Sequence, residues 1–156
     1  MSAFSTHIPS IKTAEAAIQS GNFWPPIIPP EIRAAQRIDG GITPERLHDA
    51  LVESVANVTG QLSDWRAARE AEGKTTLDDV PAETIDQVSI LEHRYRRAVG
   101  CMAKAIVLER YRDYDSSNQG DKKADATDPA IDDLRRDAAW AIRDIQGLAR
   151  TTVELI

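Results

Sequence analysis

The sequence predicts an all-α fold, a small bundle of long amphipathic helices. Apolar residues recur at three- and four-residue steps through long stretches of the chain, which is the period of a helix buried on one face. The pairs Thr43-Pro44 and Asp128-Pro129 each have the pattern of a helix N-cap followed by proline in the first turn. The chain has 156 residues, of which 42% are hydrophobic, so a single domain can bury a core of its own.

We expect three regions along the chain: an extended N-terminal arm (1–30), a helical bundle domain (31–150) and a short C-terminal tail (151–156). Four prolines among apolar residues at the end of the arm favour extended backbone. Such a segment cannot bury its large side chains in itself, so they need another surface. These side chains are predicted to pack on the chain's own body or to contact a neighbouring subunit: Phe23, Trp24, Ile27 and Ile28.

Within the bundle, a short helix is predicted to open at residues 30–33 and to end at Asp39-Gly40-Gly41. A second helix is predicted to run from Thr43-Pro44 to Gly73, roughly 40 Å at 1.5 Å per residue. Its apolar positions follow helical spacing: Leu47, Leu51, Val55, Val58, Leu62 and Trp65. A linker over residues 73–84 follows it.

A third helix is predicted after the linker, with Val88, Leu91, Tyr95, Val99, Met102 and Ile106 on one face. Its second half, residues 98–108, is apolar almost all round, which places it at the centre of the bundle. A polar stretch over residues 113–127 is predicted to separate it from a fourth helix that starts at Asp128-Pro129. That helix shares the face Leu134, Ala138, Ala141, Ile142, Ile145 and Leu148. Residues 151–156 have β-type composition, and we expect no strand elsewhere.

Charge and composition argue against several classes of protein. The net charge is −6, which is unfavourable for a protein that holds nucleic acid tightly. No stretch approaches the ~20 apolar residues of a membrane span, so no membrane partner is expected. The three histidines lie far apart, and no nucleophile, phosphate-loop or zinc motif occurs. Cys101 lies in the apolar half of the third helix and is predicted to be buried. We expect no catalytic residue, no cofactor and no metal site.

Two charged clusters each have two interpretations. Glu45, Asp49 and Glu53 form an acidic stripe at four-residue steps, which is either a solvated face or a wall facing a negative partner that must not stick, such as DNA. The basic cluster at residues 94–97 contains three arginines. Because Glu92 stands four residues before Arg96, a surface ion-pair network is favoured over a site for nucleic acid.

One tryptophan of the fourth helix lies away from its apolar stripe. Trp140 falls on the opposite side of the helix, among Asp137, Arg143 and Asp144. A tryptophan there leaves a large apolar surface in water, so we expect the N-terminal arm or a neighbouring subunit to cover it. A helical body with two extended, adhesive ends is typical of an assembly component rather than of an enzyme.

Short motifs along the chain, taken in order, resemble a known family. They are Phe23-Trp24-Pro25, Ile32-Arg33-Ala34-Ala35-Gln36-Arg37, Thr43-Pro44-Glu45-Arg46-Leu47, Leu62-Ser63-Asp64-Trp65-Arg66, Tyr95-Arg96-Arg97-Ala98-Val99, Leu108-Glu109-Arg110-Tyr111-Arg112-Asp113-Tyr114-Asp115, Arg136-Asp137-Ala138 and Thr151-Thr152-Val153-Glu154-Leu155-Ile156. Together they are similar to the phage head completion protein (GPL) family of contractile-tailed temperate phages. The similarity covers about residues 21–156.

The resemblance implies a structural connector, or adaptor, between head and tail. Such a protein assembles in the host cytoplasm and lies in the virion at the head–tail junction. It would form a ring, expected to be twelve-fold, beneath the portal protein, stabilise the filled head and meet a tail-side terminator or completion protein. Packaged DNA would pass without specific binding, beside the acidic stripe. The alternative is a small helical DNA-packaging protein, similar to a terminase small subunit, that recognises DNA.

The C-terminal tail is the predicted docking segment. A short extended segment can add as a strand to an exposed sheet edge of the portal or of a neighbouring subunit. Its main chain then provides affinity and its alternating side chains provide specificity. The residues concerned are Thr152, Val153, Glu154, Leu155 and Ile156.

Overall fold

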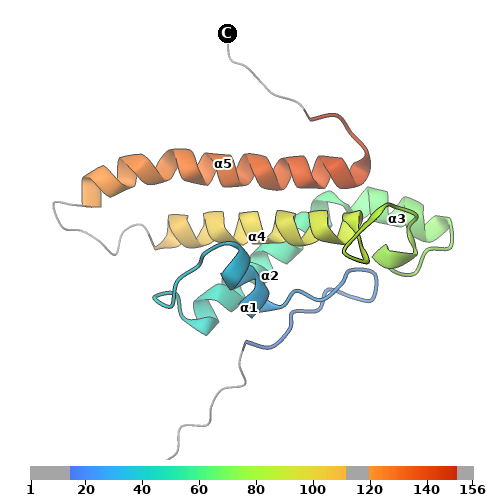
Figure 1. The fold of residues 1–156 in the computed structure, drawn as a ribbon, viewed down its shortest axis with the longest axis horizontal. Coiled ribbons are helices and arrows are strands. Elements are labelled where there is room, and N and C mark those ends of the chain that lie inside the picture. Colours follow the sequence, from blue (N-terminus) through green and yellow to red (C-terminus); the bar gives the residue numbers. More distant parts are fainter. Residues whose placement is uncertain (1–14, 112–119, 151–156) are drawn as a thin grey trace, which may run out of the picture.

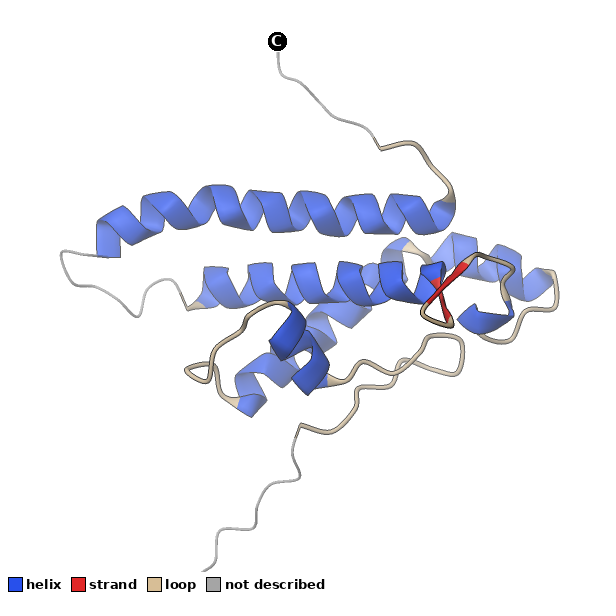
Figure 2. Cartoon of the chain, viewed as in Figure 1, coloured by secondary structure: helices blue, strands red, loops and turns tan. Residues whose placement is uncertain are grey.

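The computed structural model confirms the all-α prediction. It describes residues 15–111 and 120–150, and of residues 120–129 the backbone alone. Over these residues the chain forms five α-helices, one 3₁₀ turn and one short hairpin (Figure 2). In chain order they are α1 (Pro29–Ala35), α2 (Pro44–Gln61), α3 (Ser63–Ala71), η1 (Leu77–Asp79), β1 (Thr84–Ile85), β2 (Val88–Ser89), α4 (Ile90–Arg110) and α5 (Gly120–Gln146).

Helix α4 forms the centre of the bundle, as predicted. Helix α5 runs antiparallel along one side of it, and α2 packs on the other side (Figure 1). Ala98, Val99 and Ala103 of α4 are fully buried between these neighbours. A Cβ atom at Gly100 would stand 3.0 Å from Nε2 of Gln36, so the missing side chain leaves room for the end of α1. Small residues at the crossing thus let three helices meet on α4.

The predicted second helix is broken, which corrects the expectation of one continuous helix to Gly73. Thr43 caps α2 through its Oγ1, which accepts a hydrogen bond from the amide of Arg46 at 3.3 Å, but α2 ends at Gln61 and α3 begins at Ser63. Gly60 and Ser63 flank the break, and both residue types favour helix ends over helix interiors. The side chain of Leu62 is fully buried at the break, so core packing fixes the point where the chain turns.

Helix α5 begins earlier than the predicted start at Asp128-Pro129. Its backbone is helical from Gly120, so Pro129 lies inside the helix. A proline in this place removes one main-chain hydrogen bond, a cost that the helix carries. At the other end the helix stops at Gly147, which has φ of 70°. Its amide and that of Leu148 donate to the last turn, which is the usual glycine-type helix end.

A hairpin that was not predicted joins the end of the linker to α4, so Val88, predicted on the face of the third helix, lies in β2 instead. Strands β1 and β2 pair antiparallel, with Thr84 opposite Ser89 and Ile85 opposite Val88. Asp86 and Gln87 form the two-residue turn and both have positive φ, as a tight hairpin requires. The hairpin leads directly into α4 (Figure 2), whose first turn is capped by the hydroxyl of Ser89. Strands of two residues leave too short an alternation to detect in the sequence.

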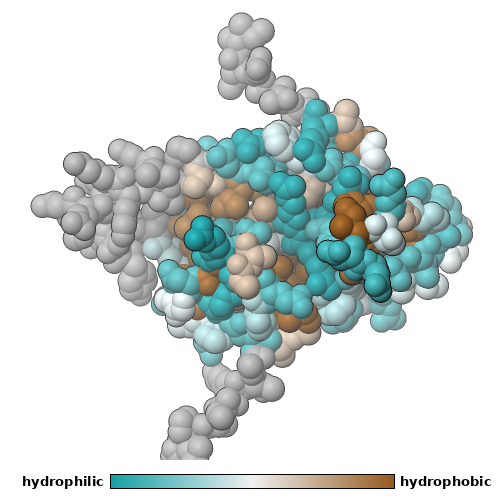
Figure 3. All heavy atoms as spheres, viewed as in Figure 1, coloured by the Kyte–Doolittle hydropathy of each residue, from teal (hydrophilic) through white to brown (hydrophobic). Residues whose placement is uncertain are grey.

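The surface is mostly polar. On the face drawn in Figure 3, hydrophilic residues dominate and hydrophobic ones lie in small separate groups. Among the described residues, the exposed large apolar side chains belong to three different segments: Val52, Ile85 and Leu148. Single exposed apolar residues of this kind are ordinary on a folded protein. The surface therefore offers small, local contact points rather than one large apolar patch in the described chain.

Candidate functional site

The acidic stripe lies on the outer face of α2. Glu45, Asp49 and Glu53 are exposed, while the opposite face of the helix packs into the core. Oδ1 of Asp49 stands 3.7 Å from Nδ1 of His48. The stripe is thus continuous and accessible, which fits a solvated face and a wall that repels phosphate equally well.

The N-terminal arm is part of the core, which favours the first of the two predicted alternatives, packing on the chain's own body, over contact with a neighbouring subunit. Phe23, Trp24 and Ile27 are each 1% exposed and belong to the main hydrophobic cluster. The arm folds back on itself, because Ile18 and Ile27 exchange main-chain hydrogen bonds of 2.8 and 2.9 Å. The amide of Leu77 donates to the carbonyl of Phe23 at 2.8 Å and ties the arm to η1. Packing on the chain's own body is the alternative that holds for these three side chains.

The aromatic residues of the arm explain why it packs inward. The Trp24 ring stacks on Tyr95 of α4 with centroids 4.9 Å apart and planes 17° apart. Phe23 meets Trp24 edge-on at 5.0 Å, and Trp65 of α3 completes the cluster at 6.4 Å from Trp24. Such pairs add about 0.5–1.5 kcal/mol each beyond the burial of their area. Prolines beside these rings restrict the unfolded arm and reduce the entropy lost on packing. Ile28 is only half-buried.

Trp140 is covered by arginines of its own chain. The ring is half-buried, with the guanidinium carbon of Arg136 at 4.7 Å and that of Arg150 at 5.3 Å from its centroid. Arginine side chains cover aromatic faces well, because the cation is attracted to the ring and is weakly hydrated. The structure thus supplies a cover that is neither the arm nor a second subunit. A contact of Trp140 with a neighbouring copy stays a prediction.

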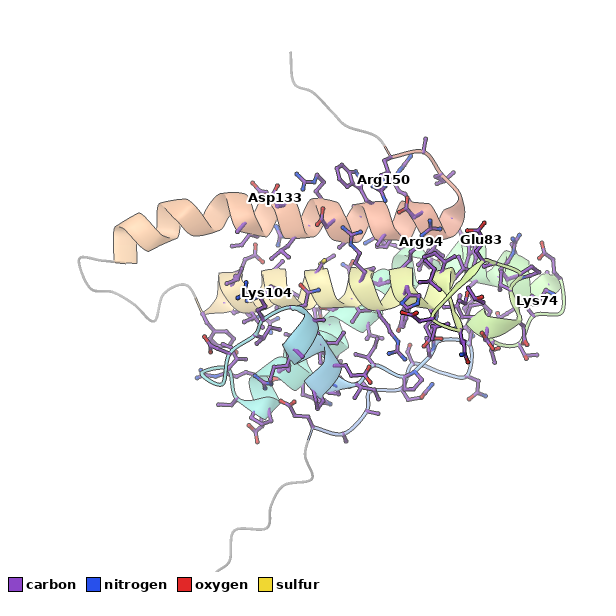
Figure 4. All side chains as sticks on the ribbon, in the orientation of Figure 1. Lys74, Glu83, Arg94, Lys104, Asp133 and Arg150 are labelled. Atoms are coloured by element: carbon purple, nitrogen blue, oxygen red, sulfur yellow. The ribbon has the colours of Figure 1, made fainter. Side chains whose placement is uncertain are left out.

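The C-terminal end of α5 holds the four residues that follow it through a set of polar contacts. The Arg150 guanidinium donates to both carboxylate oxygens of Asp144, at 3.1 and 2.6 Å. Nε of Arg143 donates to the carbonyl of Ala149 at 2.7 Å. We call Trp140, Arg143 and Asp144 with residues 147–150 the C-terminal clasp. Figure 4 shows Arg150 at this end of α5, with Arg94 of α4 at the same end of the bundle.

Asp144 is the central residue of the clasp. Nη1 of Arg94 donates to its carbonyl at 3.1 Å, and Nε of Arg94 lies 3.9 Å from its carboxylate. The side chain of Asp144 is 16% exposed. The hydrogen bond from Arg150, followed by the positive charges of Arg150, Arg94 and Arg97, lowers the pKa of this carboxyl. The carboxylate is therefore ionised and doubly engaged at neutral pH.

The basic cluster forms the predicted ion-pair network. Arg96 pairs with Glu92 at 2.7 Å and with Glu31 of α1 at 2.8 Å. Arg97 lies 3.3 Å from Asp137 of α5. These pairs link three helices across the surface and neutralise the cluster locally. The network gives the cluster a structural role and leaves less positive charge for DNA recognition.

Cys101 is a free, buried cysteine, as predicted. Burial raises the pKa of its thiol, which disfavours the reactive thiolate. Among the side chains that the structure describes, no three His, Cys, Asp or Glu residues are placed to hold a metal ion. In the same residues, every helix is too short or too polar to cross a bilayer.

Comparison with known proteins decides the family. The family model described as phage head completion protein (GPL) matches residues 18–156. The chain belongs to this family. A curated relative is the head completion/stabilization protein of Escherichia phage P2, 42% identical over 149 residues that cover 96% of this chain and 88% of the relative. No solved structure matches the chain. The protein is a structural phage head completion protein and, as such, a component of the virion.

The clasp of this head completion protein was not predicted from its sequence. The predicted docking residues 152–156 lie outside the described part of the chain, but the clasp that leads to them is described. One signal was present: Arg136 stands four residues before Trp140, and this spacing places the two side chains on one helix face. The pairing of Asp144 with Arg150 had no such signal, because the chain leaves the helix between them.

Proposed function

We propose that this head completion protein forms a ring beneath the portal of the filled head, stabilises the head and provides the site to which the tail attaches. One observation carries the proposal. The family match extends to residue 156, so the β-type segment that follows the clasp belongs to the matched region. A segment of this kind can add as a strand to an exposed edge of the portal. Along it, Val153 and Leu155 alternate with Thr152, Glu154 and Ile156.

In a ring, a weak contact between each subunit and the portal is sufficient for stable binding of the whole ring. Each subunit would dock one short segment, and a closed ring engages many portal subunits at once, so avidity raises the overall affinity. Twelve copies would match a twelve-fold portal. The lower rim of this ring would contact the tail-side terminator or completion protein. A chain that binds weakly alone and strongly as a ring assembles only on a finished portal.

The acidic stripe is proposed to face the DNA channel. Its support is the continuous exposure of Glu45, Asp49 and Glu53 on the side of α2 that does not pack against the core. Negative charge there would repel the phosphates of DNA and so prevent DNA from binding to the channel wall during ejection. In the variant Glu45→Gln, Asp49→Asn, Glu53→Gln, we expect normal assembly and slower DNA release from purified particles. Unchanged release would place the stripe away from the channel.

Contacts between subunits are proposed to involve Ile28 and Trp140, the two half-buried members of the predicted set. On ring assembly the tryptophan emission should shift to shorter wavelength in the native protein. The variant Trp140→Phe should lose that shift if Trp140 lies in the contact. An equal shift in both proteins would exclude Trp140 from the interface.

The deciding experiment deletes residues 151–156. The truncated protein should keep its helical circular dichroism and its melting temperature, because the described helices and core end before these residues. It should fail to bind DNA-filled heads that were made without this protein. Native protein added to the same heads is the control. Normal binding of the truncated protein would overturn the docking role of the tail.

A further inference from the structure

The residues that connect α5 to the docking tail have little apolar packing to hold them. Leu148 is 50% exposed, and Ala149 and Arg150 are also exposed. A chain end of this kind normally frays. Here two arginines, one carboxylate and the Trp140 ring hold it against α5 instead. The helix end itself does not require these polar contacts, since Gly147 already ends the helix.

We infer that Asp144 is a positioning residue for tail docking: by holding Arg150 against Trp140, it fixes the place on the bundle at which the described chain ends and the docking tail starts. This inference rests on the proposed function, in which those residues bind the portal. It assigns to the clasp a role that the helices themselves do not need.

The geometry of the Asp144–Arg150 pair supports this role. Two hydrogen bonds join one guanidinium to both oxygens of one carboxylate, which restricts orientation as well as distance. Arg94 of α4 also contacts Asp144, so this residue is held by two helices rather than by one. Arg143 fixes the carbonyl just before Arg150. The last described residue of the chain is therefore located relative to the rigid body of the protein.

Fixing this residue lowers the cost of docking. Without the clasp, residues 147–150 would not be held against α5. Their backbone would then also have to be ordered when the tail binds, which makes binding less favourable. In a ring, every subunit must present its tail at the same place relative to the portal. A fixed exit point raises the effective concentration of each tail at its site.

The test uses two variants that break the clasp and one matched control. Arg150→Ala removes a half-exposed side chain, and Asp144→Asn keeps the shape of its side chain while losing the charge. Arg135→Ala is the control, because Arg135 is also half-exposed on α5 and pairs with Glu109 at 2.7 Å, away from the clasp. All three should fold, as judged by circular dichroism and melting. A supplementary variant, Arg150→Lys, keeps the charge but loses the paired hydrogen bonds, and should behave like Arg150→Ala.

Binding to DNA-filled heads made without this protein is the main measurement. We expect about tenfold weaker binding for Arg150→Ala and Asp144→Asn, and native binding for Arg135→Ala. Amide hydrogen exchange at residues 148–150 should speed up in the first two variants alone.

The outcomes separate this inference from the proposed function. If deletion of residues 151–156 abolishes binding while Arg150→Ala and Asp144→Asn bind like the native protein, the clasp does not position the tail. Loss of binding in Arg135→Ala equal to that in Arg150→Ala would also overturn it. If the deletion itself binds normally, docking by the tail is wrong, and the positioning role falls with it.

Discussion

At the scale of single residues, Tyr95 is the most informative position in the core. It is fully buried on α4, and Trp24 of the N-terminal arm stacks on its ring. Its hydroxyl has no hydrogen-bond partner among the described residues. Burial raises the pKa of Tyr95 well above its usual range, which keeps the hydroxyl neutral. The ring therefore contributes to stability, whereas the hydroxyl costs desolvation without a compensating bond.

Replacing Tyr95 by phenylalanine separates the two contributions. We expect Tyr95→Phe to leave the free energy of unfolding unchanged or to raise it by up to about 1 kcal/mol, because an unpaired buried hydroxyl is removed. Tyr95→Ala should lower it by about 3–5 kcal/mol, because the stack with Trp24 is lost and a cavity remains. Urea unfolding measures both. A clear loss of stability in Tyr95→Phe would show that the hydroxyl is bonded.

At the scale of elements, the turn η1 depends on one carboxylate. Oδ2 of Asp79 accepts hydrogen bonds from the amides of Thr75 and Thr76 and from the Thr75 hydroxyl, at 2.7–3.0 Å. These bonds, that of the hydroxyl first, lower the pKa of Asp79 from 3.8 to about 2. Turn η1 also positions Leu77. The side chain of Leu77 is buried in the core, and its amide donates a hydrogen bond to the N-terminal arm. Protonation of Asp79 should therefore weaken the contact between η1 and the N-terminal arm.

Acid should loosen this turn in a defined pH window. A lowered pKa means that the stabilising effect of Asp79 is complete above about pH 4 and is lost as the pH falls towards 2. The variant Asp79→Asn should melt lower at neutral pH and should show a smaller further loss between pH 4 and 2. The neighbouring Asp78→Asn serves as control. Equal pH dependence of the native protein and Asp79→Asn would contradict the assignment.

The same scale shows what the sequence could and could not predict. Helical spacing correctly placed most core-facing positions of α2, α4 and α5, because burial on one face leaves a period in the sequence. It failed for Leu148, which is 50% exposed and follows the end of α5, and for Val88, which lies in β2. It misplaced boundaries where tertiary contacts decide them, as at Leu62, which ends α2 because its side chain is held in the core. Pro129 indicated a helix start that is not there. The clasp was missed because Asp144 and Arg150 meet only after the chain turns at Gly147.

At the scale of the whole molecule, the two ends of the chain differ in kind. The sequence predicts two extended, adhesive ends, but from Ile18 onward the N-terminal arm is built into the core through Phe23, Trp24 and Ile27. Its apolar side chains are therefore already used in folding. Of the two predicted contact segments, the C-terminal one is thus the better candidate for docking. We therefore propose that the helical body, with the N-terminal arm, forms the folded domain and that the C-terminal segment alone serves for docking.

Deleting each end should have opposite consequences. A chain starting at Pro29 loses three fully buried large side chains, each worth about 2–5 kcal/mol, against a total stability of about 5–15 kcal/mol for a domain. We expect it to lose cooperative thermal unfolding and much of its helical signal. Removing residues 151–156 should leave the melting curve unchanged and abolish binding to filled heads. Trp140→Phe, which alters a half-buried ring outside the main core cluster, should melt close to the native protein. A cooperative transition in the chain starting at Pro29 would mean that the arm adds little to the fold, and would restore it as a candidate for contact with neighbouring subunits.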